Sequence, residues 1–232
     1  QRYRQVGQLA AGAAADALRQ ARPDWSEQEL AAACVRALWL RGLQAVHVLV
    51  SGEERQQRYR RAPPAQVVLG TQVVLALCAR RFGLCASLTR QRRFGPAQHR
   101  ADGAALAMDD ADAAMLALEA VALDACETGH ALSMVYHALD SAYAFAGQPD
   151  TVRTSRQGGI HGYLAPEVAA GAHTEIILKR GMALAFHPSL PGSTVEDTFL
   201  LDGKQLHNLT HDPAWPSAMV QGRSRPLTLA LA

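Results

Sequence analysis

The hydrophobic pattern of this chain changes from a helical period to alternation twice, and this order constrains its fold most. Residues 2–21 are rich in alanine and leucine, as helices are, and end before Pro23, since the residue preceding a proline is disfavoured in the α region. A second helix is predicted from Ser26, which has a glutamate three residues on as in a capping box, to Gly42. From Val46 onwards the apolar residues alternate, which is typical of strands.

Strands complete the first half of the chain, and the second half repeats the order. After the alternating segment 46–50 and a break at Pro63-Pro64, β-rich segments at 67–79 and 82–88 are separated by two arginines, which predicts a hairpin. The second half is predicted to contain helices at 104–128 and 131–146, followed by strands at 176–178, 182–186, 194–201 and 205–209.

The repeated order indicates a single α+β domain over residues 1–232, built of two pseudo-symmetric halves of residues 1–100 and 101–232. The helix pairs are expected to pack on one face of a curved, mostly antiparallel sheet that both halves share. The opposite face of the sheet is then free to form a groove. The helical pattern begins directly at Gln1, which leaves a preceding N-terminal domain open.

Composition excludes several classes of protein. The formal net charge is +2, and the basic runs contain few aromatic residues, so no nucleic-acid partner is expected. No apolar segment approaches the ~20 residues that cross a bilayer, and no secretory leader is recognisable, so we expect a cytoplasmic protein with no membrane partner. The four cysteines lie singly in apolar segments, as expected of reduced core residues.

Several motifs resemble one family of peptidases. The run Leu88-Thr89-Arg90, the glycines around Tyr163 and the run Glu196-Asp197-Thr198 resemble segments of the methionine aminopeptidase, Xaa-Pro peptidase and creatinase family. The resemblance extends over essentially the whole chain and is strongest for the Xaa-Pro dipeptidase branch. It implies the pita-bread fold, whose order of helices and strands agrees with the one predicted above. Further matching positions are Arg58-Tyr59-Arg60-Arg61, Gly83, Phe94-Gly95, Gly158, Gly159, Gly162, Glu167, Gly181-Met182, Pro188, Gly192 and Trp215-Pro216.

Enzymes of this family hold two divalent metal ions, such as Mn, Co or Zn, with five side chains. The resemblance implies that this chain keeps one of the five, Glu196. The two aspartates of the family fall on Ala76 and Ser87, and its other glutamate falls on His187. The ligand histidine falls on Gly159, with Arg156 or His161 as neighbouring alternatives, and two accessory histidines fall on Arg61 and Pro166.

These substitutions predict that the usual metal centre is lost. Alanine has no ligand atom, and serine does not supply the negative charge that two divalent ions need. No cofactor is therefore expected. One ion could still bind to His161, His187 and Glu196, because two imidazoles and a carboxylate form a recognised catalytic zinc set.

A groove that has lost aspartates and gained arginines is expected to prefer anions. Its ligand is predicted to be a small anionic or peptide molecule. Arg90 is expected either to contact the substrate or to form a structural ion pair with Glu167 or Glu196. The candidate substrate-binding residues are Arg61, Arg90, His161, Glu167, His187 and Glu196, with Arg156 as a further cation.

The sequence supports three interpretations and leaves catalysis open. We interpret the chain as a peptidase-like, non-metallo binding protein or pseudoenzyme. The alternative is a hydrolase of a peptide or another C–N bond, with metal-independent or single-metal machinery and His187 or His161 as the general base. A third interpretation is a degenerate domain that only forms a homodimer or supports a further domain.

Overall fold

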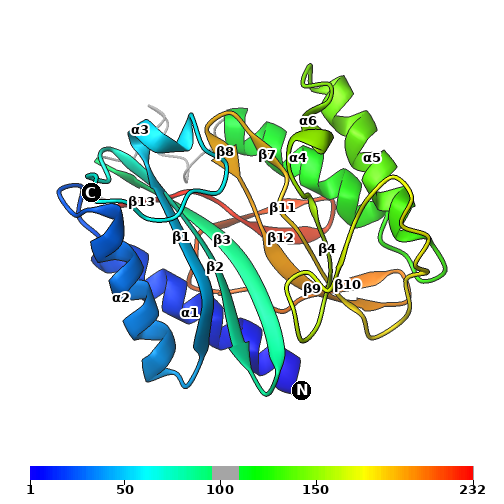
Figure 1. Cartoon of the computed structure of the whole chain (residues 1–232), viewed down its shortest axis with the longest axis horizontal. Coiled ribbons are helices and arrows are strands. Elements are labelled where there is room, and N and C mark those ends of the chain that lie inside the picture. Colours follow the sequence, from blue (N-terminus) through cyan, green and yellow to red (C-terminus); the bar gives the residue numbers. More distant parts are fainter. Residues whose placement is uncertain (96–109, 232) are drawn as a thin grey trace.

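Two helices of the first half of the chain cover one face of a four-stranded sheet (Figure 1). Three strands of this sheet come from the first half and one from the second. These elements belong to a computed structural model that describes residues 1–95 and 110–231. The helices are α1 (Arg2–Gln20) and α2 (Glu27–Leu40), and the strand order is β1 (Gln44–Gly52), β2 (Gln72–Arg81), β3 (Leu84–Phe94) and β13 (Leu229–Leu231). The predicted hairpin of β2 and β3 is confirmed, and β13 pairs with β3 in parallel.

Local sequence explains why both helices pack closely. A Cβ atom on Gly7 of α1 would lie 2.2 Å from the carbonyl oxygen of Leu209, so only glycine permits this contact with the second half. The predicted capping box opens α2, because the Ser26 hydroxyl accepts from the Glu29 amide at 3.2 Å and the Glu29 carboxylate accepts from the Ser26 amide at 2.6 Å. A short helix, α3 (Glu53–Gln56), follows β1.

The second half repeats the arrangement with shorter strands. Its helices are α4 (Asp110–Asp124), α5 (Leu132–Phe145) and the short α6 (Thr151–Thr154). An antiparallel sheet has the order β10 (Gln205–Asn208), β9 (Asp197–Asp202), β6 (Ala183–Phe186), β4 (Gly158–His161) and β5 (Val168–Ala169). Two separate hairpins complete the second half. They are β7 (Ser189–Leu190) with β8 (Ser193–Thr194), and β11 (Ser217–Val220) with β12 (Arg223–Pro226).

The two sheets meet where β3 runs beside the start of β9. The amide of Thr89 donates to the carbonyl of Glu196 at 2.9 Å, and the two residues form an isolated bridge. The Thr198 hydroxyl accepts from the Ser87 amide and donates to the Ser87 carbonyl, both at 2.8 Å. The α+β class and the antiparallel pairing agree with the prediction, but the sheet consists of two parts joined at this seam.

Four predicted elements differ from the observed ones. The strand predicted at 67–79 begins only at residue 72, as β2. The backbones of Val67 and Leu69 form hydrogen bonds with the segment that opens α2 instead. Ile177 makes only an isolated bridge with Ala131, so the predicted strand at 176–178 is wrong. The predicted strand at 194–201 is interrupted at Glu196, whose backbone turns to β3. Helix α4 ends at Asp124, before the predicted Thr128, and its predicted start at 104–109 lies outside the described residues.

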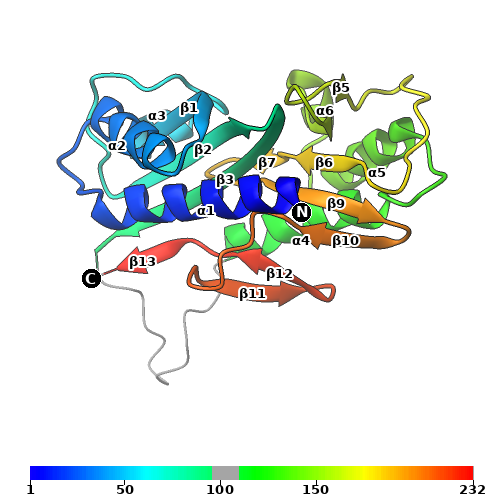
Figure 2. The same cartoon turned by 90° about the horizontal axis from the view of Figure 1, so that it is seen from below.

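Each half buries its own hydrophobic core between helices and sheet. Figure 2 shows the halves side by side, with α2 and α5 at opposite ends of the molecule. Trp215 and Leu229, which follow the second sheet in sequence, pack into the core of the first half. Among the described helices, none combines the length and apolar character that a membrane span requires.

Candidate functional site

The face of the first sheet away from α1 and α2 carries the positions singled out by the resemblance. Ala76 is paired with Thr89, and Cys78 is paired with Ser87. Residues two apart on a strand point to the same side, so all four side chains share one face. His47 is the partner of Cys78 on β1 and therefore joins the same face. Ala76 and Ser87, the predicted substitutes for two aspartates, thus lie on one face of adjacent strands.

Glu196 lies at the seam between the sheets and is nearly inaccessible, with 2% of its side chain exposed. Its Oε2 atom is 3.4 Å from Nη1 of Arg61 and 3.4 Å from the hydroxyl of Thr89. Its Oε1 atom is 3.6 Å from Nδ1 of His187, just beyond hydrogen-bonding distance. The guanidinium of Arg61 also contacts Nε2 of His47 at 3.1 Å. We refer to Glu196, Arg61, His47, His161 and His187 as the central cluster.

The charges of the central cluster follow from burial and from Arg61. Burial alone would raise the pKa of Glu196, but Arg61 and then His187 hold it well below its usual range. Burial lowers the pKa of His161 to about 4, and the Glu196 carboxylate only partly opposes this shift. Burial, followed by the charge of Arg61, also lowers the pKa of His47. The cluster therefore combines an ionised carboxylate and a guanidinium with a neutral His161 at pH 7.

Two buried imidazole nitrogens in the central cluster have no hydrogen-bond partner among the described residues. They are Nδ1 of His161 and Nδ1 of His187. His161 ends β4 and is 4% exposed. A buried polar atom without a partner costs about 1–3 kcal/mol, so these nitrogens are suited to receive a polar group of a ligand or a water.

His161 is the alternative that the structure favours for the ligand-histidine position. A Cβ atom on Gly159 would lie 2.0 Å from the carbonyl oxygen of Val168, so no side chain fits at Gly159 without backbone movement. Arg156 is exposed on the surface before β4. Pro166, the second accessory position, follows a cis peptide bond in the loop between β4 and β5.

Neither Arg90 nor Glu167 pairs with the Glu196 carboxylate, although Arg90 reaches the Glu196 backbone carbonyl at 3.4 Å. Arg90 is 3% exposed and pairs with Asp197 at 2.8 Å, while also donating to the carbonyl of Thr210 at 2.8 Å. The expected pairing with the Glu167 or Glu196 carboxylate is thus wrong, since the side chain of Arg90 points to the next residue, Asp197. The carboxylate of Glu167 instead accepts from the amide of Tyr163 at 2.6 Å.

Asp197 belongs to a second buried charge network behind the central cluster. Arg225 bonds to Asp197 at 2.7 Å and to both carboxylate oxygens of Glu119, at 2.7 and 2.5 Å. Two guanidinium groups thus face two carboxylates in the interior, which balances their charges. This network joins α4, β9, β3 and β12 and has a structural role.

The sequence did not identify His47 as a site residue. Alternation at 46–50 predicts the strand and its faces, but the pairing with Cys78 depends on the register of β1 on β2. The contact with Arg61 depends in addition on the path of the loop between α3 and β2. A histidine on the groove side of an alternating strand was the available signal.

The side chains of the central cluster do not fit a pair of divalent ions. Two ligand positions hold Ala76 and Ser87, and the Glu196 carboxylate faces a permanent cation. Within the described ranges, no group of three or more His, Cys, Asp or Glu residues is placed to hold a metal ion. We therefore derive no chemical step through a metal.

Comparison with solved structures shows the same fold in peptidases. The chain is 19% identical to dipeptidase PepE from Mycobacterium ulcerans (TM-score 0.77), and the match covers 98% of this chain and 59% of that one. For the Xaa-Pro dipeptidase from Bacillus anthracis the identity is 16%, the TM-score 0.76 and the coverage 98% and 61%. For prolidase from Pyrococcus furiosus the identity is 17% and the TM-score 0.76, and the match covers 90% of this chain and 62% of that one. The chain thus spans about three fifths of the length of these proteins.

Sequence comparison gives the family. A search of curated protein sequences finds no significant match. The family model described as "Metallopeptidase family M24" matches residues 1–206, most of the chain. Together with the pita-bread fold of its structural neighbours, this match shows that the chain belongs to metallopeptidase family M24.

Proposed function

We propose that this chain is a metal-free member of the M24 family that binds a small anionic or peptide ligand in its groove, as a binding protein or pseudoenzyme. The observation that carries this proposal is the contact between Arg61 and Glu196, at 3.4 Å. Glu196 matches a metal ligand of the family, yet its negative charge is balanced here by a side chain of the protein itself.

The charge of Arg61 argues against a divalent ion at the same place. Two unit charges 4 Å apart interact by about 4 kcal/mol at an effective dielectric constant of 20, so a divalent ion beside the guanidinium would be opposed by about 8 kcal/mol. The resemblance implies that family enzymes balance the charge of their two ions with carboxylates. The aspartate positions of this chain hold Ala76 and Ser87, which carry no charge.

The remaining groups of the central cluster suit binding. Nδ1 of His161 and Nδ1 of His187 are buried and have no hydrogen-bond partner among the described residues, so a ligand could bond to them without breaking a hydrogen bond. Neutral imidazoles can donate or accept a hydrogen bond according to their tautomer. They therefore suit the amide or hydroxyl groups of a small polar ligand.

One observation favours the alternative of a hydrolase with altered machinery. His187 lies 3.6 Å from Glu196, and a histidine next to a carboxylate is a common general-base arrangement. His161 is the weaker candidate, because its pKa of about 4 makes it a poor proton acceptor at pH 7. In this alternative His187 would activate a water, and Arg61 would hold an acidic group of the substrate.

Three further properties stay predictions from the sequence: the cytoplasmic location, a homodimer and a preceding N-terminal domain.

The proposal is tested by metal analysis together with ligand titration. Protein purified without added metal should contain well under one equivalent of Mn, Co or Zn. Adding these ions should leave the melting temperature unchanged, whereas an ion at a hundred times its dissociation constant would add about 2.7 kcal/mol of stability. Short peptides should bind and be recovered intact. Two equivalents of bound metal, or metal-dependent cleavage of the peptides, would refute the proposal.

A further inference from the structure

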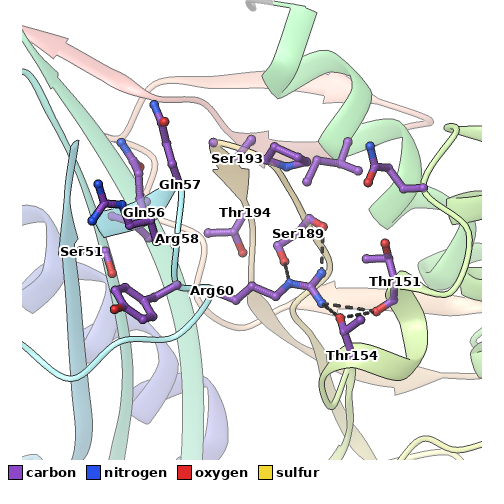
Figure 3. Close-up of a pocket in the computed structure, with 16 residues that line it drawn as sticks. Ser51, Gln56, Gln57, Arg58, Arg60, Thr151, Thr154, Ser189, Ser193 and Thr194 are labelled. Atoms are coloured by element: carbon purple, nitrogen blue, oxygen red, sulfur yellow. Dashed lines mark hydrogen bonds between the residues drawn. The ribbon is translucent and has the colours of Figure 1, made fainter. Parts of the chain in front are cut away.

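A hollow of about 240 Å³ lies next to the central cluster on the same side of the first sheet (Figure 3). Its floor includes Ser51 and Val74, which are cross-strand partners on β1 and β2. Residues 56–60 line one wall, and the β7–β8 hairpin with Thr151 and Thr154 of α6 lines the other.

The hairpin connects the hollow to the central cluster. His187 stands two residues before Ser189 of β7, and Glu196 stands two residues after Thr194 of β8. The base of the hairpin thus holds two members of the cluster, while its strands line the hollow. A ligand in the hollow would therefore lie beside the cluster.

Arg60 spans the hollow from one wall to the other (Figure 3). Its Nε atom donates to the Ser189 hydroxyl at 2.5 Å, and Nη2 donates to the Ser189 carbonyl at 2.9 Å. Its Nη1 atom donates to the hydroxyls of Thr154 at 2.8 Å and Ser155 at 2.7 Å. Weaker contacts reach Thr151 and Tyr143. All these partners are uncharged, and no carboxylate of the described residues forms an ion pair with Arg60.

These contacts satisfy the N–H groups of Arg60 but leave its positive charge uncompensated. The Ser189 hydroxyl, which accepts from Arg60 and lines the hollow, donates to no described group. An acidic group in the hollow could accept the Ser189 hydroxyl proton while lying close to the guanidinium. Hydrogen bonds to an ionised acceptor are roughly twice as strong as neutral ones.

Arg58, which lines the same hollow, differs from Arg60 in this respect. It is largely exposed and forms an ion pair with Glu54 at 3.6 Å, so its charge is already balanced. The charge of Arg61, which follows Arg60 in sequence, is balanced by Glu196. Of the arginines in this short segment, Arg60 is the one left with neutral partners.

We infer that the hollow is a subsite for the acidic group, a carboxylate or a phosphate, of the ligand whose remainder contacts the central cluster. This inference rests on the proposed function and adds the chemical class of the ligand. Arg60 supplies the charge, and Ser189 supplies a hydrogen bond.

A matched pair of probes tests the inference. N-acetyl-dialanine and its C-terminal amide differ only in the carboxylate, and isothermal titration gives the affinity of each. The unchanged protein should bind the acid at least ten times more tightly than the amide. Arg60→Gln should reduce this preference to within twofold, whereas Arg58→Gln, the matched control, should retain it. If inorganic phosphate competes with the acid, the hollow binds a phosphate group as well as a carboxylate.

Arg60 also joins the two halves, so its replacement could unfold the protein. Ser189→Ala removes only a hydroxyl and should weaken binding of the acid several-fold at an unchanged melting temperature. Equal binding of acid and amide to the unchanged protein would overturn the inference and leave the proposed function standing. If neither probe nor phosphate binds, both the inference and the proposed function are overturned.

Discussion

Arg61 and Glu196 are 135 positions apart in sequence, and their side chains lie 3.4 Å apart at the seam between the two sheets. The carboxylate is almost fully buried, while the guanidinium is 29% exposed. The pair therefore joins a buried anion to a cation that partly faces the groove. Its energy is open to direct measurement.

The first prediction concerns this pair. A double-mutant cycle of Arg61→Met and Glu196→Gln in urea denaturation should give a coupling energy of about 1–3 kcal/mol, because the buried carboxylate loses its closest cation. The exposed pair of Arg58 and Glu54 is the control and should couple by at most about 1 kcal/mol. A coupling below the control would show that Glu196 is stabilised by other groups.

The second prediction concerns the pH dependence of stability. The pKa of His161 is about 4 in the folded protein, below its ordinary value, so the unfolded chain takes up a proton first as the pH falls. Stability is thus fully present above pH 6.5 and is lost progressively towards pH 4, by on the order of 3 kcal/mol at the limit. Burial and the charge of Arg61 also lower the pKa of His47, so His47 contributes to the loss in the same direction.

Urea denaturation at pH 7.5 and 5.0 measures this effect. The loss of stability between the two pH values should be smaller by about 2 kcal/mol in His161→Asn than in the unchanged protein. His211→Asn, which replaces an exposed histidine, should leave the loss unchanged. An equal loss in both variants would show that His161 does not titrate as its burial implies.

Part of the site could be predicted from sequence and part could not. The helix pairs, the β2–β3 hairpin and the groove face follow from hydrophobic period and from turn residues, which are local properties. Local sequence does not predict which arginine contacts Glu196, and Arg61, Arg90 and Arg156 were all candidates. Arg90 is held by Asp197 instead, and Arg156 stays at the surface, because strand register and loop path decide these contacts.

The third prediction separates buried from exposed ion pairs. Arg90→Met should destabilise the protein by about 3–5 kcal/mol, because it removes one of the two guanidinium groups that balance Asp197 and Glu119 in the interior. Arg22→Met removes an exposed pair with Asp24 and should cost at most about 1 kcal/mol. Chemical denaturation of both variants provides the comparison. Similar small effects would assign Arg90 a role outside the structural network.

The fourth prediction reverses the substitutions at the metal positions. Ala76→Asp, Ser87→Asp and His187→Glu restore three carboxylates, and Arg61→Ala removes the competing cation. This variant should gain stability when Mn²⁺ or Co²⁺ is added, by about 2.7 kcal/mol at a hundred times the dissociation constant. The same three carboxylates with Arg61 retained should respond more weakly. If Arg61 makes no difference, the guanidinium is not the group that opposes metal.

The neighbouring residues Arg60 and Arg61 reach different partners, Ser189 and Glu196, from the loop between α3 and β2. Connecting loops generally tolerate insertions and deletions, since their backbones run over the surface. Adding or removing one residue before this pair would move each guanidinium out of register with its partner and disturb both ends of the groove together. The loop between α3 and β2 is thus expected to keep a constant length among functional relatives of this protein, even where its other residues change.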